Sequence, residues 1–162
     1  MYRILVVCTG NICRSPMGEG LLKDRIAKAG LSDKVRVRSA GTWADFGYAA
    51  SENGVTVAAE DDIDIAEHRS HPITAQLIEG SHLVLVMTPE HRAEILANYP
   101  EAESRVHILT TFADEVNGDP HGVADPIGGN LAAYRKTYME LTGLIDAAMP
   151  KILQLIEEET AP

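Results

Sequence analysis

The sequence predicts an α/β fold, namely one domain with a doubly wound, four-stranded parallel sheet and helices on both faces. Two observations lead to this prediction. Short apolar runs at 3–7 and 83–87 are typical of strands buried on both faces, and segments of helical periodicity lie between the strand candidates. The length of 162 residues suits a single domain spanning 1–162, and an apolar content of 45% is enough to form a core.

Four runs are candidate strands. Those at 3–7 and 83–87 are the most apolar. Residues 35–38 alternate apolar with charged side chains, as expected of a strand near a sheet edge, and 106–109 is a weaker candidate. Strands that alternate with helices along the whole chain favour a parallel sheet.

Helices are predicted between these strands. Ser15 can cap the first helix, Pro16 suits its first position, and Gly30 can end it. Two more helices are predicted at 73–80 and 89–98, and the second begins with a proline. The sequence predicts a loop over 42–62 that can contain one helix.

The C-terminal region predicts one long amphipathic helix whose apolar stripe packs on its own sheet rather than on a coiled-coil partner. Pro150 is expected to kink this helix or to end it early. The acidic segment 157–162 is expected to be a frayed, solvated tail. The stripe consists of Leu131, Tyr134, Tyr138, Leu141, Ile145, Ala148, Ile152 and Leu155.

Charge and apolar runs exclude several classes of function. With 14 Lys and Arg against 24 Asp and Glu, the net charge is −10, which repels nucleic acid and anionic membranes. No apolar run approaches the roughly 20 residues of a membrane span, and no secretory signal is evident, so a cytoplasmic location is expected. Two cysteines are too few for a disulfide framework or a four-cysteine zinc site, so no metal is expected.

The residues most informative about function lie where the first strand meets the first helix. A loop that enters a helix N-terminus points several backbone N–H groups at one place, and such a nest binds phosphate-like oxyanions. Gly10 and Asn11 tolerate the left-handed backbone that a tight loop requires. The run reads Cys8-Thr9-Gly10-Asn11-Ile12-Cys13-Arg14-Ser15.

This arrangement predicts a nucleophilic thiolate. The helix dipole, the loop N–H groups and Arg14 all favour the thiolate form of Cys8, and Ser15 lies close enough to donate a hydrogen bond to it. Arg14 can hold two phosphoryl oxygens at once. Either Cys8 or Arg14 alone would more often be structural, and no lysine of a Walker loop is present. Cys13 could trap Cys8 in a reversible disulfide, so a redox pair remains an alternative.

Several motifs along the chain match one known family. They are the opening run 4–17, Ser39-Ala40-Gly41-Thr42, Asp64-Ile65 followed by His68-Arg69-Ser70, Met87-Thr88, and Asp125-Pro126 ahead of the last helix. With these motifs the sequence resembles the low-molecular-weight protein tyrosine phosphatases, least well over 43–60. The resemblance implies a four-stranded parallel sheet flanked by helices. It also implies hydrolysis of phosphomonoesters through a phosphocysteine, without a cofactor or metal.

The resemblance also implies roles for individual residues. Cys8 would attack phosphorus, Arg14 and the amides of 9–15 would hold the phosphoryl oxygens, and Asp125 would act as general acid and then as general base. Asp119-Pro120 is a second Asp-Pro pair. We assign the acid to Asp125 because the residues that follow it match the family spacing, and expect Asp119 to be a turn residue. The residues expected to brace the loop are Asn11, Ser15, Ser39 and His68.

The predicted substrate is phosphotyrosine in proteins, with phosphoarginine as the alternative. Tyrosine-directed relatives usually carry an aromatic residue after Asp-Pro, whereas this chain carries Ile127, and the loop 125–129 also resembles the bacterial protein arginine phosphatase branch. Ile12 favours tyrosine, because the arginine branch tends to carry threonine at that position. The predicted pocket residues are Ile12, Trp43 and Ile127, with Phe46 or Tyr48 as other sources of an aromatic wall.

Two other functions remain as weaker alternatives. An arsenate reductase could use the same thiolate on this scaffold, but the thioredoxin-coupled type needs further cysteines and none follows Cys13. A non-catalytic phosphate-binding module would not need Asp125. The expected partner is a phosphorylated protein or peptide, recognised locally because the net charge of −10 gives no long-range attraction.

Overall fold

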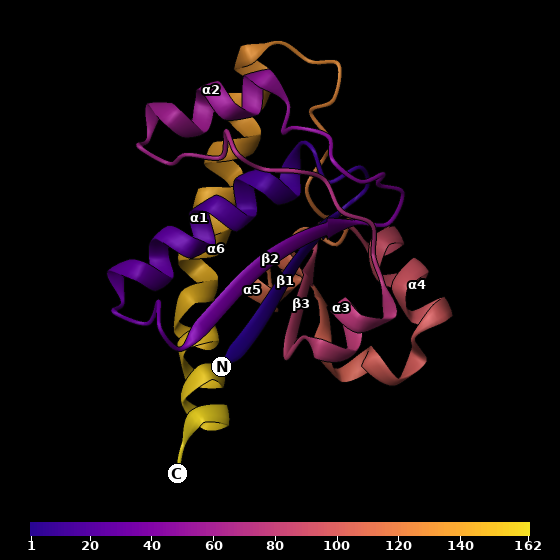
Figure 1. Cartoon of the computed structure of the whole chain (residues 1–162), viewed down its shortest axis with the longest axis vertical. Helices are drawn as coiled ribbons and strands as arrows, with labels where there is room; N and C mark the ends of the chain where they lie inside the picture. Colours follow the sequence, from indigo (N-terminus) through magenta and orange to yellow (C-terminus); the bar gives the residue numbers. More distant parts are fainter.

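Four parallel strands form one sheet in the order β2-β1-β3-β4 in the computed structural model, which describes all 162 residues (Figure 1). The predicted α/β sheet is therefore confirmed, and β2 lies on an edge as its alternating pattern predicts. The strands are β1 (Tyr2–Cys8), β2 (Val35–Gly41), β3 (Leu83–Val86) and β4 (Val106–Ile108).

Helices cover both faces of this sheet, as predicted (Figure 1). The larger apolar core lies between the sheet and α1, α2, α5 and α6, and the smaller core lies under α3 and α4. The helices are α1 (Arg14–Lys28), α2 (Glu52–Glu60), α3 (Ala75–Gly80), α4 (Pro89–Asn98), α5 (Leu109–Ala113) and α6 (Leu131–Thr160), and η1 (Pro100–Arg105) is a 3₁₀ helix. None of the helices combines the length and the apolar character needed to cross a bilayer.

The strand order places a ligand site after β1. From β1 the chain moves outward to β2, whereas β3 and β4 lie on the other side of β1. Ligands of open α/β sheets bind at such a reversal, beyond the carboxyl ends of the strands. The loop that joins β1 to α1 occupies this position.

The early end that Pro150 offered as one of two outcomes for α6, and the frayed tail predicted after it, are both wrong. The helix does not end at Pro150 but continues to Thr160, because Ile152 and Ile156 beyond the proline are buried in the larger core. Residues 157–160 are therefore helical rather than frayed, although their side chains are exposed. Leu131 and Leu155 at the ends of the predicted stripe are only half-buried.

The start of α1 also differs from the prediction. The helix begins at Arg14 after Cys13, and no side chain caps it. Ser15 is not a cap because its hydroxyl contacts Cys8 instead. The predicted end is confirmed, since Gly30 follows the helix with a φ of 73°, a conformation that favours glycine.

Candidate active site

The loop between β1 and α1 turns its carbonyl oxygens outward. The carbonyls of Cys8, Thr9 and Ile12 accept hydrogen bonds from backbone N–H groups of the segment 42–51 at 2.8 to 3.0 Å. The N–H groups of residues 10–13 donate to no group of the chain. Because these donors sit at the N-terminus of α1, the loop can bind an oxyanion through its backbone.

Asn11 holds the loop together from inside. It is fully buried with a φ of 56°, the left-handed conformation that asparagine tolerates. Its Nδ2 donates to Ser15 Oγ at 2.7 Å and to Ser39 Oγ at 2.9 Å, and its Oδ1 accepts the backbone N–H of His71 at 2.9 Å. The His68 ring donates from Nε2 to the Asn11 carbonyl at 2.7 Å. The structure thus brings together the four residues predicted to brace the loop.

The Cys8 thiol sits at the end of β1 and is 2% exposed. Its Sγ lies 2.9 Å from Ser15 Oγ. Because Ser15 Oγ already accepts a hydrogen bond from Asn11, its own proton is available to the sulfur. The hydroxyl can therefore stabilise negative charge on Cys8.

Arg14 is buried and held in one orientation. Its Nη1 donates to the carbonyl of Val123 at 2.8 Å and its Nη2 to Thr9 Oγ1 at 3.2 Å. Its Nε is buried and has no partner in the chain, which leaves one fixed donor for an anion. The backbone beside Val123 requires Gly122, since a Cβ there would lie 2.0 Å from the carbonyl oxygen of Met87.

Asp125 faces the loop, whereas Asp119 does not. Asp125 Oδ2 lies 3.4 Å from Arg14 Nη2, and its Oδ1 accepts the N–H of Ile127 at 3.1 Å. Its side chain is 34% exposed, so it can reach solvent as well as the loop. Asp119 accepts the N–H of His121 at 2.8 Å in a turn, as predicted for the second Asp-Pro pair. Of the two candidates, only Asp125 contacts Arg14.

The sequence gives no direct sign of His91, which the structure places beneath the loop. The ring is buried, and its Nε2 lies 2.8 Å from Thr9 Oγ1, the atom to which Arg14 also donates. Its Nδ1 accepts the N–H of Thr88 at 3.2 Å, so Nε2 carries the proton given to Thr9. Burial, followed by the charge of Arg14, lowers the pKa of His91 to about 4. A neutral histidine therefore holds Thr9 and, through it, Arg14.

Cys13 has hydrogen-bond partners of its own, outside this network. Its Sγ is 3.1 Å from Ser51 Oγ and 3.3 Å from the Tyr134 hydroxyl. Burial raises the pKa of the Cys13 thiol. Both cysteines are free, and no group of three His, Cys, Asp or Glu side chains could hold a metal ion.

The predicted pocket residues form an open rim rather than an enclosed slot. Trp43 is 79% exposed and Ile127 is 62% exposed, whereas Ile12 is partly buried against the larger core. The Phe46 ring packs edge-on against His71 with centroids 4.5 Å apart, on the side of β2. Tyr48 is also exposed. The backbone N–H of Trp43 donates to the carbonyl of Thr9 in the loop at 2.9 Å.

The family model for the low molecular weight phosphotyrosine protein phosphatases matches residues 3–161. The chain belongs to this family. This phosphatase is similar to the protein-arginine-phosphatase of Geobacillus stearothermophilus, with 39% identity over 93% of this chain and 96% of the relative. It is also similar to the protein-arginine-phosphatase of Bacillus subtilis, with 38% identity over 88% of this chain and 91% of the relative.

Solved structures show the same fold. The phosphatase superposes on the low molecular weight protein tyrosine phosphatase from T. tengcongensis with a TM-score of 0.85 and 37% identity, over 93% of this chain and 99% of the other. The predicted family is therefore confirmed, and the chain is a protein phosphatase. Its relatives include enzymes named for both phosphoamino acids, so the family alone does not select the substrate.

Proposed function

We propose that this phosphatase removes phosphate from phosphotyrosine in proteins through a phosphocysteine intermediate on Cys8. The observation that carries the proposal is a set of fixed donors with no acceptor in the chain, next to a buried thiol. These donors are the N–H groups of 10–13 and Nε of Arg14. These donors can bind the three oxygens of a phosphoryl group while it is transferred to the thiol.

In the first step, Cys8 Sγ attacks phosphorus and the bond to the tyrosine oxygen breaks. Arg14 and the loop N–H groups hold the three remaining oxygens throughout. Protonated Asp125 gives its proton to the leaving phenolate oxygen. The exposure of Asp125 and its place beside Arg14 support this role.

In the second step, water attacks the phosphocysteine and the sulfur–phosphorus bond breaks. Asp125, now a carboxylate, takes a proton from the water. Cys8 leaves as a thiolate, which Ser15 stabilises through the 2.9 Å contact. The products are inorganic phosphate and the starting enzyme.

The choice of tyrosine rests on Ile12. An apolar side chain at the loop surface can pack against a phenol ring but has no acceptor for the N–H groups of a phosphorylated guanidinium. Exposed Trp43 supplies a further apolar surface on the rim. Desolvating guanidinium N–H groups against Ile12 without a partner would weaken binding of phosphoarginine.

Phosphoarginine is the second candidate substrate. Two relatives at 39% and 38% identity are named protein-arginine-phosphatases, and the chain carries Ile127 rather than an aromatic residue after Asp125-Pro126. The carboxylate of Asp125 could accept from the guanidinium.

The test is phosphate release from matched phosphotyrosine and phosphoarginine peptides of one sequence, without added metal and with Cys8→Ser as the blank. We expect a higher kcat/KM for the phosphotyrosine peptide. A higher value for the phosphoarginine peptide would overturn the choice of tyrosine but not the mechanism. Turnover by Cys8→Ser would overturn the mechanism.

We also propose that the enzyme acts in the cytoplasm. Both cysteines are free, and a thiolate nucleophile stays free of disulfide bonds only in a reducing compartment. Detection of the protein in fractionated cells tests this location.

A further inference from the structure

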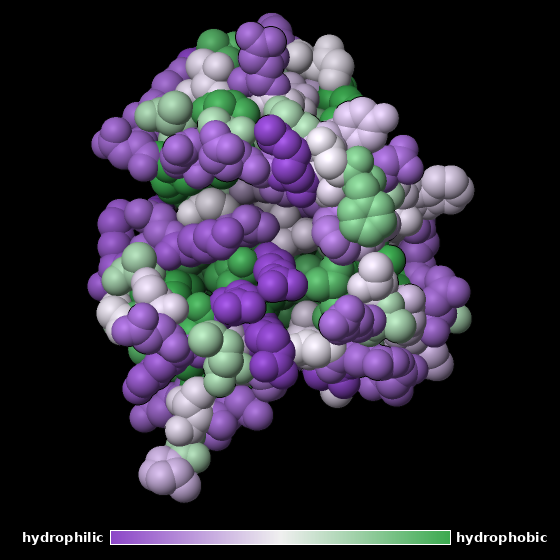
Figure 2. Space-filling model, in the orientation of Figure 1, coloured by the Kyte–Doolittle hydropathy of each residue, from purple (hydrophilic) through white to green (hydrophobic).

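The sheet face under α3 and α4 is left uncovered at β2. On this face β2 presents Arg36 and Arg38, and β1 presents Arg3 directly opposite Arg36 in the strand register. All three side chains are exposed. Strongly hydrophilic side chains gather over β1 and β2 in this view, with apolar surface beside them (Figure 2). We call the cavity beside them the arginine groove.

The arginine groove has a volume of about 520 Å³ and lies between β2 and α3. The three arginines line it together with Phe46, His71 and Gln76, and no acidic residue lines it. Arg36 and Arg38 form no ion pair, and the Arg3 side chain donates only to the backbone carbonyls of Gly80 and Met1.

This concentration of positive charge is unusual for the chain. The protein has a net charge of −10, so acidic side chains are plentiful, yet none neutralises these arginines. Like charges directly opposite one another on paired strands destabilise the sheet slightly. A surface that keeps such charges unpaired is complementary to an anionic partner.

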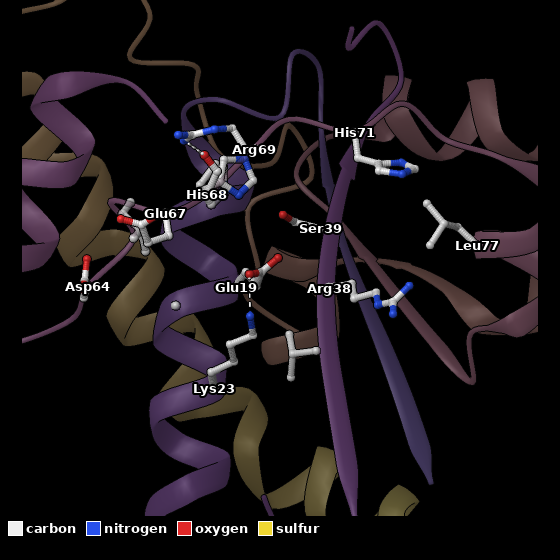
Figure 3. Close-up of a pocket in the computed structure, with 14 residues that line it drawn as sticks. Glu19, Lys23, Arg38, Ser39, Asp64, Glu67, His68, Arg69, His71 and Leu77 are labelled. Atoms are coloured by element: carbon white, nitrogen blue, oxygen red, sulfur yellow. Dashed lines mark hydrogen bonds and ion pairs between the residues drawn. The ribbon is translucent and has the colours of Figure 1, made fainter. Parts of the chain in front are cut away.

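The arginine groove begins beside the phosphate loop. The backbone N–H of His71 donates to Asn11 inside that loop, while the His71 side chain lines the groove. Figure 3 shows Arg38, His71 and Leu77 on one side of β2, and Glu19, Lys23 and His68 on the other. Arg38, His71 and Leu77 also line a neighbouring cavity that contains Glu19, Asp64 and Glu67, but these acidic residues lie across the strand from Arg38 and form no ion pair with it.

The strand register gives the spacing between groove and nucleophile. Gly41 pairs with Cys8, and Arg36 lies five residues before Gly41 on β2. At about 3.3 Å per residue this is roughly 16 Å along the strand. An extended peptide with its phosphorylated residue at Cys8 would reach Arg36 with a residue about five positions away.

We propose that the arginine groove binds an acidic segment of the phosphoprotein substrate while the phosphorylated side chain occupies the phosphate loop. The inference rests on the proposed function and adds a substrate class to it, namely phosphoproteins with a run of acidic residues about five positions from the modified residue. The exposed ring of Phe46 offers apolar contact to the peptide at the end of the groove nearest the loop.

The experiment compares phosphotyrosine peptides that carry either three glutamates or three glutamines centred about five positions from the phosphotyrosine. Each pair is made with the run before and with the run after the phosphotyrosine, and a small aryl phosphate serves as a third substrate. We expect a kcat/KM about three- to tenfold higher for the glutamate peptide in one orientation, mostly through KM, and a loss of this advantage at high salt.

Arg36→Gln with Arg38→Gln should remove the advantage and leave the glutamine peptide and the aryl phosphate unchanged. The matched control is Lys28→Gln with Lys136→Gln, which makes the same change in net charge on exposed residues that do not line the groove. Equal loss in the control would overturn the proposal.

Other results distinguish other occupants. Equal kcat/KM for both peptides in the wild type would overturn the groove proposal and leave the proposed function intact, whereas no hydrolysis of any substrate would overturn the proposed function. Wild-type dimers that Arg36→Gln with Arg38→Gln dissociates would replace the peptide by a second copy of the chain as the occupant of the groove.

Discussion

The phosphate loop and the rim around it are built in opposite ways. In the loop 8–15, side chains such as Asn11 and Arg14 are buried and each makes several hydrogen bonds. On the rim, Trp43 and Ile127 are largely exposed and have few fixed contacts. The chemistry therefore depends on a closed network, whereas the choice of substrate depends on side chains that can change without disturbing it.

The largest expected effect comes from breaking the loop network at Arg14. Arg14→Lys cannot donate to Val123 and Thr9 and still present a donor to the phosphoryl group, so we expect kcat to fall by at least about 10³-fold for every substrate. Steady-state kinetics with the aryl phosphate measure this. Arg92→Lys is the control, because Arg92 also donates to a backbone carbonyl but lies outside the site. Ordinary turnover by Arg14→Lys would contradict the role of the loop.

Asp125 lies between loop and rim, and its variant should discriminate between leaving groups. We expect Asp125→Asn to slow a phosphotyrosine peptide by about 10² to 10⁴-fold and an activated aryl phosphate much less, since only the poor leaving group needs a proton. Asp119→Asn is the matched control because Asp119 also precedes proline. If Asp119→Asn instead produced the selective loss, the assignment of the acid would be wrong.

A change at Ile12 should affect specificity more than catalysis. Ile12→Thr adds a hydroxyl that can accept from a guanidinium, so we expect the ratio of phosphoarginine to phosphotyrosine kcat/KM to rise about tenfold. The aryl phosphate serves as the control for an intact loop. An unchanged ratio would mean that Ile12 does not contact the substrate.

His91 should give the smallest effect on activity and a distinct effect on stability. His91→Gln can still donate to Thr9, so we expect only a few-fold loss of kcat. Because burial lowers the pKa of His91 from 6.5 to about 4, the folded state binds fewer protons than the unfolded state between these values. This histidine therefore destabilises the fold as pH falls from 6.5 to about 4.

Urea unfolding across that pH range measures the effect. The free energy of unfolding of the wild type should fall more steeply with decreasing pH than that of His91→Gln. Parallel pH dependences would show that His91 is protonated as easily in the folded chain as in the unfolded one.

Local patterns made most of the fold predictable. The strands follow from apolar runs, the start of α4 follows from Pro89, and the end of α1 follows from Gly30, each to within a few residues. The helix does not end early at Pro150 because burial of Ile152 and Ile156 outweighs the hydrogen bond that the proline removes. The prediction that Ser15 caps α1 is wrong because its hydroxyl contacts the thiol of Cys8. Local sequence pattern cannot reveal such a tertiary contact.

The distinction between local pattern and tertiary contact also applies to the active site. Cys8 and Arg14 are close in sequence, so their loop is evident from spacing. His91 meets Thr9 across 82 residues, through the pairing of β1 with β3. The sequence signal that could have found it is Thr88-x-x-His91 directly after a buried strand, a helix start at the same sheet edge as the loop.

The central position of β1 ties the nucleophile to the most slowly opening part of the molecule. β1 is bonded to a strand on each side, and Cys8 is its last residue. Amide hydrogens of such a strand exchange with solvent only when the whole domain opens. Fluctuations that loosen the rim should therefore leave the position of the thiol at the end of β1 unchanged. Slow amide exchange in β1 and enzymatic activity should disappear together at one denaturant concentration.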